Sequence, residues 1–113
     1  MQQRSNPSPT DILLDLQKTL QERKNAPVEK SYAASLYAKG LDAILKKLGE
    51  EAAETIIAAK NPDDAALVYE AADLWYHTLV LLTAKDIPVT AVTDELARRM
   101  GTSGLAEKAA RTK

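Results

Sequence analysis

The stretch LGEEAAETIIAAKNPDDAALVYEAADLWYH, residues 48–77, predicts the centre of the fold. Two segments rich in Ala, Leu and Glu, which are strong helix formers, flank the dipeptide Asn61-Pro62. Asn tolerates the left-handed conformation just past a helix end, and Pro suits the first turn of a new helix. We therefore expect two antiparallel helices, covering about 41–60 and 63–84, joined by a tight turn.

Carboxylates recur at helical spacing on both sides of this turn. Glu51 and Glu54 lie three residues apart before it, and Glu70 and Asp73 lie three apart after it. Residues at i and i+3 share one face of a helix. Counting outward from the turn places Glu54 level with Glu70 and Glu51 level with Asp73, because the two helices rise equally. The four carboxylates are therefore expected to converge within about one helical turn.

The predicted helix over 63–84 contains few other ionisable residues. Between Ala65 and Ala84 its only acids or imidazoles are Glu70, Asp73 and His77, which form one stripe among apolar residues. A helix that is apolar nearly all round is expected to be buried, and buried carboxylates need a cation or a proton. Clustered oxygen ligands suit Mg²⁺ or Mn²⁺, which can clamp a polyphosphate and activate water. We therefore predict a divalent metal site.

The predicted helix over 41–60 is expected to face the core through one apolar arc, with Glu51 and Glu54 at the border of that arc. The residues of this arc are Leu45, Leu48, Ala52, Ile56 and Ala59.

The carboxylates are also compatible with two different roles. The acids could form structural ion pairs with Lys39, Lys46 or Lys47, since a lone Glu-x-x-Glu is typical of a solvated helix face. A di-iron carboxylate bundle would need Glu-x-x-His twice, whereas the only histidine, His77, lies four residues after Asp73.

The remaining sequence predicts further helices. Thr10 is expected to cap a helix with apolar residues at helical spacing. Residues 31–38 are predicted as a short helix or a structured crossing. Pro88 opens a last long helix that ends near Met100, and a short helix is expected over 105–111.

These elements predict an all-α fold, a helical bundle built on a central αα-hairpin, because strand-like alternation is missing from the sequence. Residues 10–113 are expected to form a single domain, and residues 1–9 a disordered tail rich in polar residues and proline.

The composition limits the classes of function. The chain has 113 residues, no cysteine, one histidine and a net charge of −1. Without cysteine, disulfides and thiolate metal sites are excluded, and a reducing compartment fits. The charge gives no basic field for nucleic acid, and the longest apolar run, Leu79–Leu82, is too short to span a bilayer. We expect a cytoplasmic protein with no nucleic-acid or membrane partner.

Five segments of the sequence resemble the phosphoribosyl-ATP pyrophosphohydrolase family. They are Ser31-Tyr32, Ala38–Asp42, Leu45–Glu54, Glu70–His77 and Ala97–Lys108. The pattern Glu-Glu-x-x-Glu … Glu-x-x-Asp alone is shared by MazG-like, all-α nucleoside triphosphate pyrophosphohydrolases. The flanking Ser-Tyr, Lys-Gly-Leu-Asp and Gly-x-Ser-Gly-x-x-Glu-Lys elements narrow the resemblance to the histidine-pathway family.

This resemblance implies the second step of histidine biosynthesis: Mg²⁺-dependent hydrolysis of phosphoribosyl-ATP to phosphoribosyl-AMP and pyrophosphate, by a homodimer. Family members often carry Thr where this chain has Ala33. The residues implied in the site fall into three groups. The metal ligands are Glu51, Glu54, Glu70 and Asp73; the catalytic acids are Glu51, Glu54 and the accessory Glu50; and the candidate phosphate contacts are Lys47, His77 and Lys108.

Two alternative functions follow from the same residues. One is a house-cleaning hydrolase that acts on non-standard deoxynucleoside triphosphates at the same site. The other is a helical association module without enzymatic activity, although such a module gains nothing obvious from Glu70 and Asp73 in an apolar helix.

Overall fold

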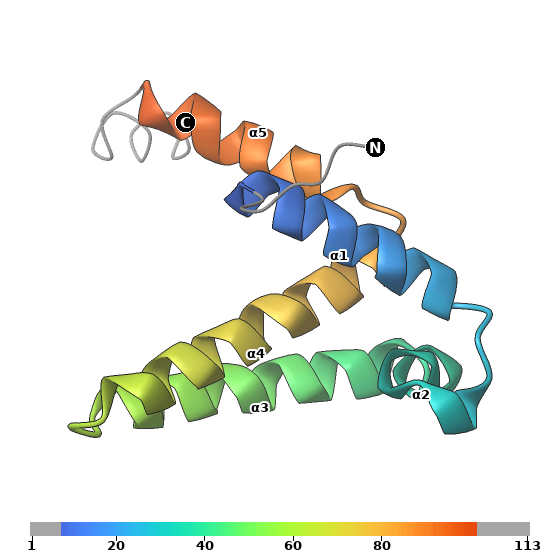
Figure 1. Ribbon diagram of the computed structural model, residues 1–113, viewed down its shortest axis with the longest axis horizontal. Helices are drawn as coiled ribbons and strands as arrows, with labels where there is room; N and C mark the ends of the chain where they lie inside the picture. Colours follow the sequence, from blue (N-terminus) through green and yellow to red (C-terminus); the bar gives the residue numbers. More distant parts are fainter. Residues whose placement is uncertain (1–7, 102–113) are drawn as a thin grey trace, which may run out of the picture.

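The computed structural model describes residues 8–101, and within that range every regular element is a helix (Figure 1). The elements in chain order are α1 (Pro9–Arg23), the 3₁₀ turn η1 (Val28–Lys30), α2 (Tyr32–Lys39), α3 (Leu41–Ala59), α4 (Asp64–Ala84) and α5 (Val89–Met100). The all-α prediction is confirmed, and the segment predicted as a short helix or crossing over 31–38 proves to be a helix, α2, capped by Ser31. Residues 1–7 of the predicted tail and the helix predicted over 105–111 lie outside the described residues.

The α3–α4 hairpin forms where the sequence predicted it, and the two helices make the most extensive contact between elements in the described part of the chain. Local side-chain bonds define the turn. The Asn61 side-chain oxygen accepts from the Asp63 amide at 3.0 Å, and Asp63 caps α4 by accepting from the Ala65 amide at 3.0 Å. From this turn α3 and α4 run side by side and then diverge: the far end of α3 lies beside α2, and α4 rises toward α1 (Figure 1).

Helix α1 begins earlier than the sequence suggested. The N-cap is Ser8, whose hydroxyl accepts from the Asp11 amide at 3.1 Å, so the expectation that Thr10 is the cap was wrong. Pro9 explains the difference, because a proline at the first helical position lacks the amide that would otherwise need a partner. At the other helix junction, Gly40 links α2 to α3 with φ of 102°, a conformation that side chains disfavour.

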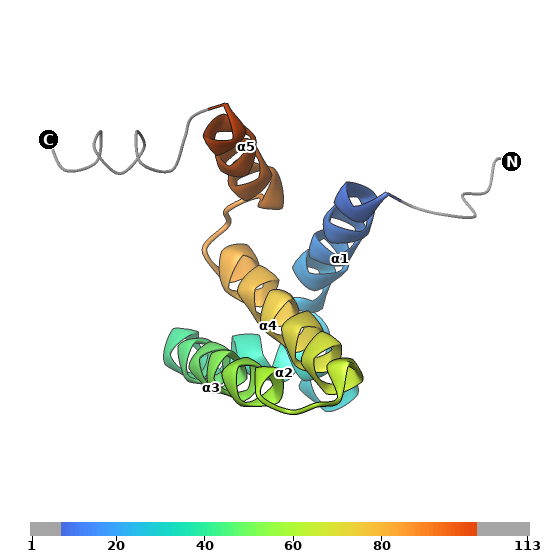
Figure 2. The ribbon, with the colours of Figure 1, turned by 90° about the vertical axis from the view of Figure 1, so that its left-hand side faces the viewer.

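The core lies where α1, α2, the first turn of α3, the C-terminal half of α4 and the start of α5 meet. Its most buried members include Leu20, Leu36, Ile44, Val80 and Val89. Helices α1 and α5 extend to the same side of the hairpin and diverge from each other (Figure 2). Among residues 8–101, no helix is both long and apolar enough to cross a membrane.

One side chain ties α1 to the connection between α4 and α5. The Gln17 amide nitrogen donates to the Thr83 hydroxyl at 3.2 Å and to the Ile87 carbonyl at 2.9 Å, while its oxygen accepts from the Val89 amide at 2.6 Å. Since Gln17 satisfies backbone groups that no helix ladder pairs, it fixes where α5 starts.

Helix α3 does not bury the apolar arc that its sequence suggested. The buried residues are Ile44, Glu51 and Ala58, whereas Leu45 is 44% exposed and Ile56 is 67% exposed. The expected orientation was wrong because α4 packs on the side of α3 that carries Glu51. In the described chain the arc therefore has little to pack against.

Helix α4 likewise keeps an apolar surface in solvent. Val68 is 68% exposed and Trp75 is 62% exposed, so the expectation of a helix buried nearly all round was wrong for its N-terminal half. The C-terminal half, with Leu79, Val80 and Thr83, is buried in the core.

Candidate metal centre

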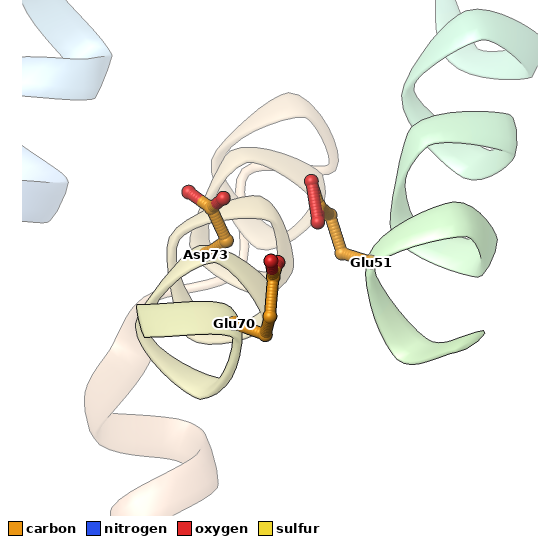
Figure 3. A group of neighbouring side chains, drawn as sticks. All are labelled: Glu51, Glu70 and Asp73. Atoms are coloured by element: carbon orange, nitrogen blue, oxygen red, sulfur yellow. The ribbon is translucent and has the colours of Figure 1, made fainter. Parts of the chain in front are cut away.

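Three carboxylates converge between α3 and α4. Glu51 comes from α3, and Glu70 and Asp73 come from α4; each offers an oxygen, and these oxygens all lie within 4.8 Å of one another. Figure 3 shows the Glu51 side chain reaching from α3 toward α4, where the carboxylates of Glu70 and Asp73 lie beside it. The convergence predicted from the spacing is therefore present for these three residues, because the antiparallel packing brings both helices to the same level.

The buried oxygens of this group lack partners within the described residues. Glu51 is only 3% exposed, and its Oε2 atom, like Oε1 of Glu70, is buried without a hydrogen bond. A buried acceptor without a donor is destabilising, and neighbouring carboxylates add repulsion. Hard, oxygen-only ligands in this number suit Mg²⁺ or Mn²⁺. The residues present therefore fit a divalent cation.

The surroundings make ionisation of the two glutamates unfavourable in the absence of metal. Burial raises the pKa of Glu51, and the neighbouring Glu54 and Asp73 raise it further, while Lys47 opposes them. Removal from water raises the pKa of Glu70, and Glu54 again adds to the effect. A bound cation would reverse this by favouring the charged carboxylates.

Lys47 is the one lysine among residues 39, 46 and 47 that forms an ion pair with the cluster in the described chain. Its Nζ atom lies 3.8 Å from Oε1 of Glu50 and 3.8 Å from Oε1 of Glu51. Neither contact is short enough for a hydrogen bond. One lysine at this distance does not balance three carboxylates, so structural ion pairing accounts for the cluster poorly.

The other predicted acids lie at the edge of the group. Glu54 is exposed and lies outside the mutual set of three, although it influences both Glu51 and Glu70. Glu50 is also exposed and pairs with Lys47. Lys108 falls outside the described residues.

His77 is buried beside the backbone of Asp73. It is 3% exposed, and both ring nitrogens have partners: Nε2 lies 2.9 Å from the Tyr32 hydroxyl and Nδ1 lies 2.7 Å from the Asp73 carbonyl oxygen. His77 was expected to be a phosphate contact, whereas this placement favours support of the helix turn that carries Asp73.

Sequence reasoning missed two residues near the centre. The Thr55 hydroxyl lies 2.8 Å from the Glu51 carbonyl and 3.2 Å from the Glu70 carbonyl, so it links α3 to α4 beside the acids. Its position four residues after Glu51, on the same helix face, was a usable signal. Tyr32 belongs to the Ser-Tyr family motif, but its contact with His77 gave no signal in the spacing, because the two residues lie 45 positions apart in the sequence.

The raised pKa values of Glu51 and Glu70 predict how the stability of the fold depends on pH and on bound metal. Folded protein holds protons on Glu51 and Glu70 that the unfolded chain releases, so without metal the free energy of unfolding should fall as pH rises from 4.5 through the raised pKa values. Excess Mg²⁺ at about 100 times its Kd should add about 2.7 kcal/mol.

Thermal melts in EDTA and in Mg²⁺, at about pH 5 and about pH 8, measure this, with the larger metal effect expected at the higher pH. Glu95, whose pKa Arg98 and Arg99 lower to about 2, acts in the opposite direction, but only below pH 4.5. An equal Mg²⁺ effect at both pH values would contradict the assignment.

Comparison with known proteins places the chain among enzymes of one kind. Residues 13–100 match the family described as phosphoribosyl-ATP pyrophosphohydrolase. The chain is 56% identical to the phosphoribosyl-ATP pyrophosphatase of Ruthia magnifica subsp. Calyptogena magnifica over 101 residues, 89% of this chain and 96% of that protein. It is 58% identical to the protein of that name from Trichlorobacter lovleyi over 100 residues, 88% of this chain and 93% of that protein.

Proposed function

Because the chain belongs to the phosphoribosyl-ATP pyrophosphohydrolase family, we propose that it hydrolyses phosphoribosyl-ATP to phosphoribosyl-AMP and pyrophosphate, the second step of histidine biosynthesis. The observation that carries the proposal is the set of Glu51, Glu70 and Asp73 oxygens within 4.8 Å of one another, two of these side chains having buried oxygens without partners. A group of this kind is suited to hold a cation beside a triphosphate.

Glu51, Glu70 and Asp73 would hold the Mg²⁺, and Glu54 would complete the set from its exposed position. When bound, the ion supplies charge neutralisation for the phosphates and acidifies a water molecule. In the reaction, water adds to the α-phosphate and the bond from that phosphorus to the oxygen bridging to the β-phosphate breaks. The leaving group departs as pyrophosphate.

The protein side chains around the acids would do three things. Lys47 would bind a phosphate oxygen and offset the charge of the departing pyrophosphate, and Lys108 is proposed for the same role. The exposed Glu50 and Glu54 would orient the water or take its proton. Glu51 would act through the cation, and His77 would hold the helix turn that carries Asp73.

The direct test is pyrophosphate release by the purified protein. We expect Mg²⁺-dependent release from phosphoribosyl-ATP, with loss of activity in EDTA and recovery on adding Mg²⁺ or Mn²⁺. A panel of deoxynucleoside triphosphates tests the alternative substrate class. Faster turnover of any of them than of phosphoribosyl-ATP would overturn the assigned substrate, and no turnover of either would favour the association module.

We also propose that the protein is a homodimer that pairs through an apolar face on the α3–α4 hairpin. This face consists of Leu41, Leu45 and Ile56 from α3 with Val68 and Trp75 from α4, each between 42% and 68% exposed. At 100° per residue, the α3 members fall within about 60° of one another, and Val68 and Trp75 lie two turns apart on one side of α4.

The two parts of this apolar face lie on the same side of the hairpin. Each is rotated about 90–120° from the α3–α4 contact, in the same sense when viewed from its own N-terminus, which in an antiparallel pair places both on one side. The side chains of Glu54 and Asp73 are rotated the other way. A continuous exposed apolar surface is typical of an interface, and a second copy would cover it without covering the acids.

A further inference from the structure

Thr55 joins the two helices of the candidate metal centre at the backbone of two proposed ligands. Its hydroxyl lies 2.8 Å from the Glu51 carbonyl oxygen on its own helix, α3, and 3.2 Å from the Glu70 carbonyl oxygen on α4. Both carbonyls can only accept, so the hydroxyl is the donor to each, in a shared, three-centre hydrogen bond. Thr55 therefore connects the backbone of a ligand on α3 to the backbone of a ligand on α4.

Only one of these two hydrogen bonds is ordinary for a threonine in a helix. Threonine commonly donates to the carbonyl four residues earlier, and Thr78 does so in α4, where its hydroxyl lies 2.8 Å from the Leu74 carbonyl. Thr55 makes the same bond within α3 and, in addition, reaches a carbonyl of the facing helix. This second bond holds the backbones of α3 and α4 close together at the level of the acids.

The separation of α3 and α4 matters because the ligands are divided between the two helices. Glu51 comes from α3, whereas Glu70 and Asp73 come from α4, and their oxygens lie within 4.8 Å of one another. Mg²⁺ requires near-octahedral oxygens at about 2.0–2.1 Å, whereas Ca²⁺ accepts more flexible sets at about 2.3–2.6 Å. A wider separation of the helices would therefore weaken binding of Mg²⁺ more than binding of Ca²⁺.

The carboxylates themselves oppose a short separation. Oε2 of Glu51 and Oε1 of Glu70 are buried without hydrogen-bond partners among the described residues, and like charges at this distance repel. The Thr55 hydroxyl bonds to the backbone carbonyls of these same two residues. It therefore opposes the repulsion at the place where the repulsion arises.

We propose that Thr55 is a positioning residue that sets the separation of α3 and α4 at the metal centre and thereby makes the centre selective for Mg²⁺ over Ca²⁺. Thr55 acts through the backbones of Glu51 and Glu70, without touching the ion or the substrate. The inference rests on the cation of the proposed function, but not on which triphosphate is cleaved.

The affinities of the full chain for Mg²⁺ and Ca²⁺ test this role. Each ion displaces bound Mn²⁺, which electron paramagnetic resonance detects. Thr55→Val keeps the shape of the side chain but removes the hydroxyl, and it should weaken Mg²⁺ binding about 10-fold, as loss of a group that orients a metal ligand does. Ca²⁺ binding should weaken less than about 3-fold, because Ca²⁺ tolerates the wider set. An equal loss for both ions, or no loss for either, would overturn the proposal.

Thr78→Val is the matched control, because it removes the equivalent bond within one helix. It should leave both affinities unchanged, and a loss of Mg²⁺ selectivity in this variant would count against a special role for Thr55.

A second pair of variants isolates the hydroxyl even if Thr55→Val does not fold. Thr55→Ser keeps the hydroxyl and Thr55→Ala lacks it, and alanine is the strongest helix former. Thr55→Ser should bind Mg²⁺ nearly as the parent chain does, whereas Thr55→Ala should bind it about 10-fold more weakly. The same Mg²⁺ affinity in the two variants would refute the role of the hydroxyl.

These affinities are measured without substrate, so they separate failure of this inference from failure of the proposed function. If the parent chain binds Mg²⁺ but does not hydrolyse phosphoribosyl-ATP, the assigned function is wrong, and the Thr55 variants still decide the role of Thr55. If the parent chain hydrolyses phosphoribosyl-ATP and Thr55→Val keeps its Mg²⁺ affinity, the function stands and the role is wrong. A parent chain that binds neither Mn²⁺ nor Mg²⁺ would refute the centre and the role together.

Discussion

Glu51→Gln should reduce kcat by on the order of 10³-fold or more while making the metal-free protein more resistant to heat. Gln keeps the volume of the side chain but cannot supply the anionic ligand, and losing about 4 kcal/mol of charge stabilisation in the transition state corresponds to that factor. The stability gain follows because Gln needs neither a buried charge beside Glu70 and Asp73 nor the uptake of a proton to avoid one. The new amide can also donate to the orphaned Glu70 oxygen.

Kinetics with saturating Mg²⁺ and thermal melts in EDTA measure both effects on one preparation. Glu22→Gln, at an exposed acid of α1, is the matched control and should alter neither quantity. The stabilisation of the parent chain by Mg²⁺ should be lost in Glu51→Gln and retained in Glu22→Gln. A Glu51→Gln protein that keeps its turnover, or that melts several degrees lower in EDTA, would remove Glu51 from the proposed centre.

Ile56→Glu should convert the proposed dimer to a monomer. Ile56 is 67% exposed in the single chain, and covering such a side chain stabilises association by about 1.5–3 kcal/mol. A two-fold interface contains each substitution twice, so the dimer Kd should rise by roughly 10²- to 10⁴-fold, before the added penalty of a buried carboxylate. Sedimentation across a concentration series measures the change.

The neighbouring residue provides the control for this experiment. Ile57 is 69% exposed, almost the same as Ile56, but it points about 100° further round α3 and away from the apolar face. Ile57→Glu should leave the dimer intact, and circular dichroism should show that both variants stay helical. If Ile57→Glu dissociates the dimer and Ile56→Glu does not, the interface lies on the other side of the hairpin. If the parent chain is monomeric across the concentration series, the proposed homodimer is wrong.

The local pattern of the sequence was enough to determine the hairpin and its register. Asn61 and Pro62 separate the two helices, with Asp63 capping the second, and the equal rise of two helices leaves a single level at which the acids can meet. Convergence of the acids was therefore predictable, although the spacing also placed Glu54 in the group that Glu51, Glu70 and Asp73 form. The family motifs pointed to a metal-assisted hydrolase. Every step in that inference depends on neighbours within one helix or across one short turn.

Tertiary structure alone decided which side of each helix is covered and which distant residues join the site. Helix α3 carries apolar residues on more than one side. The packing of α4 buries the side with Glu51 and leaves the side with Ile56 exposed. Likewise, no periodicity connects Tyr32 to His77, because their contact depends on how α2 docks on α4. Spacing along the chain specifies faces within an element, whereas contacts between elements depend on the free energy of packing the whole chain.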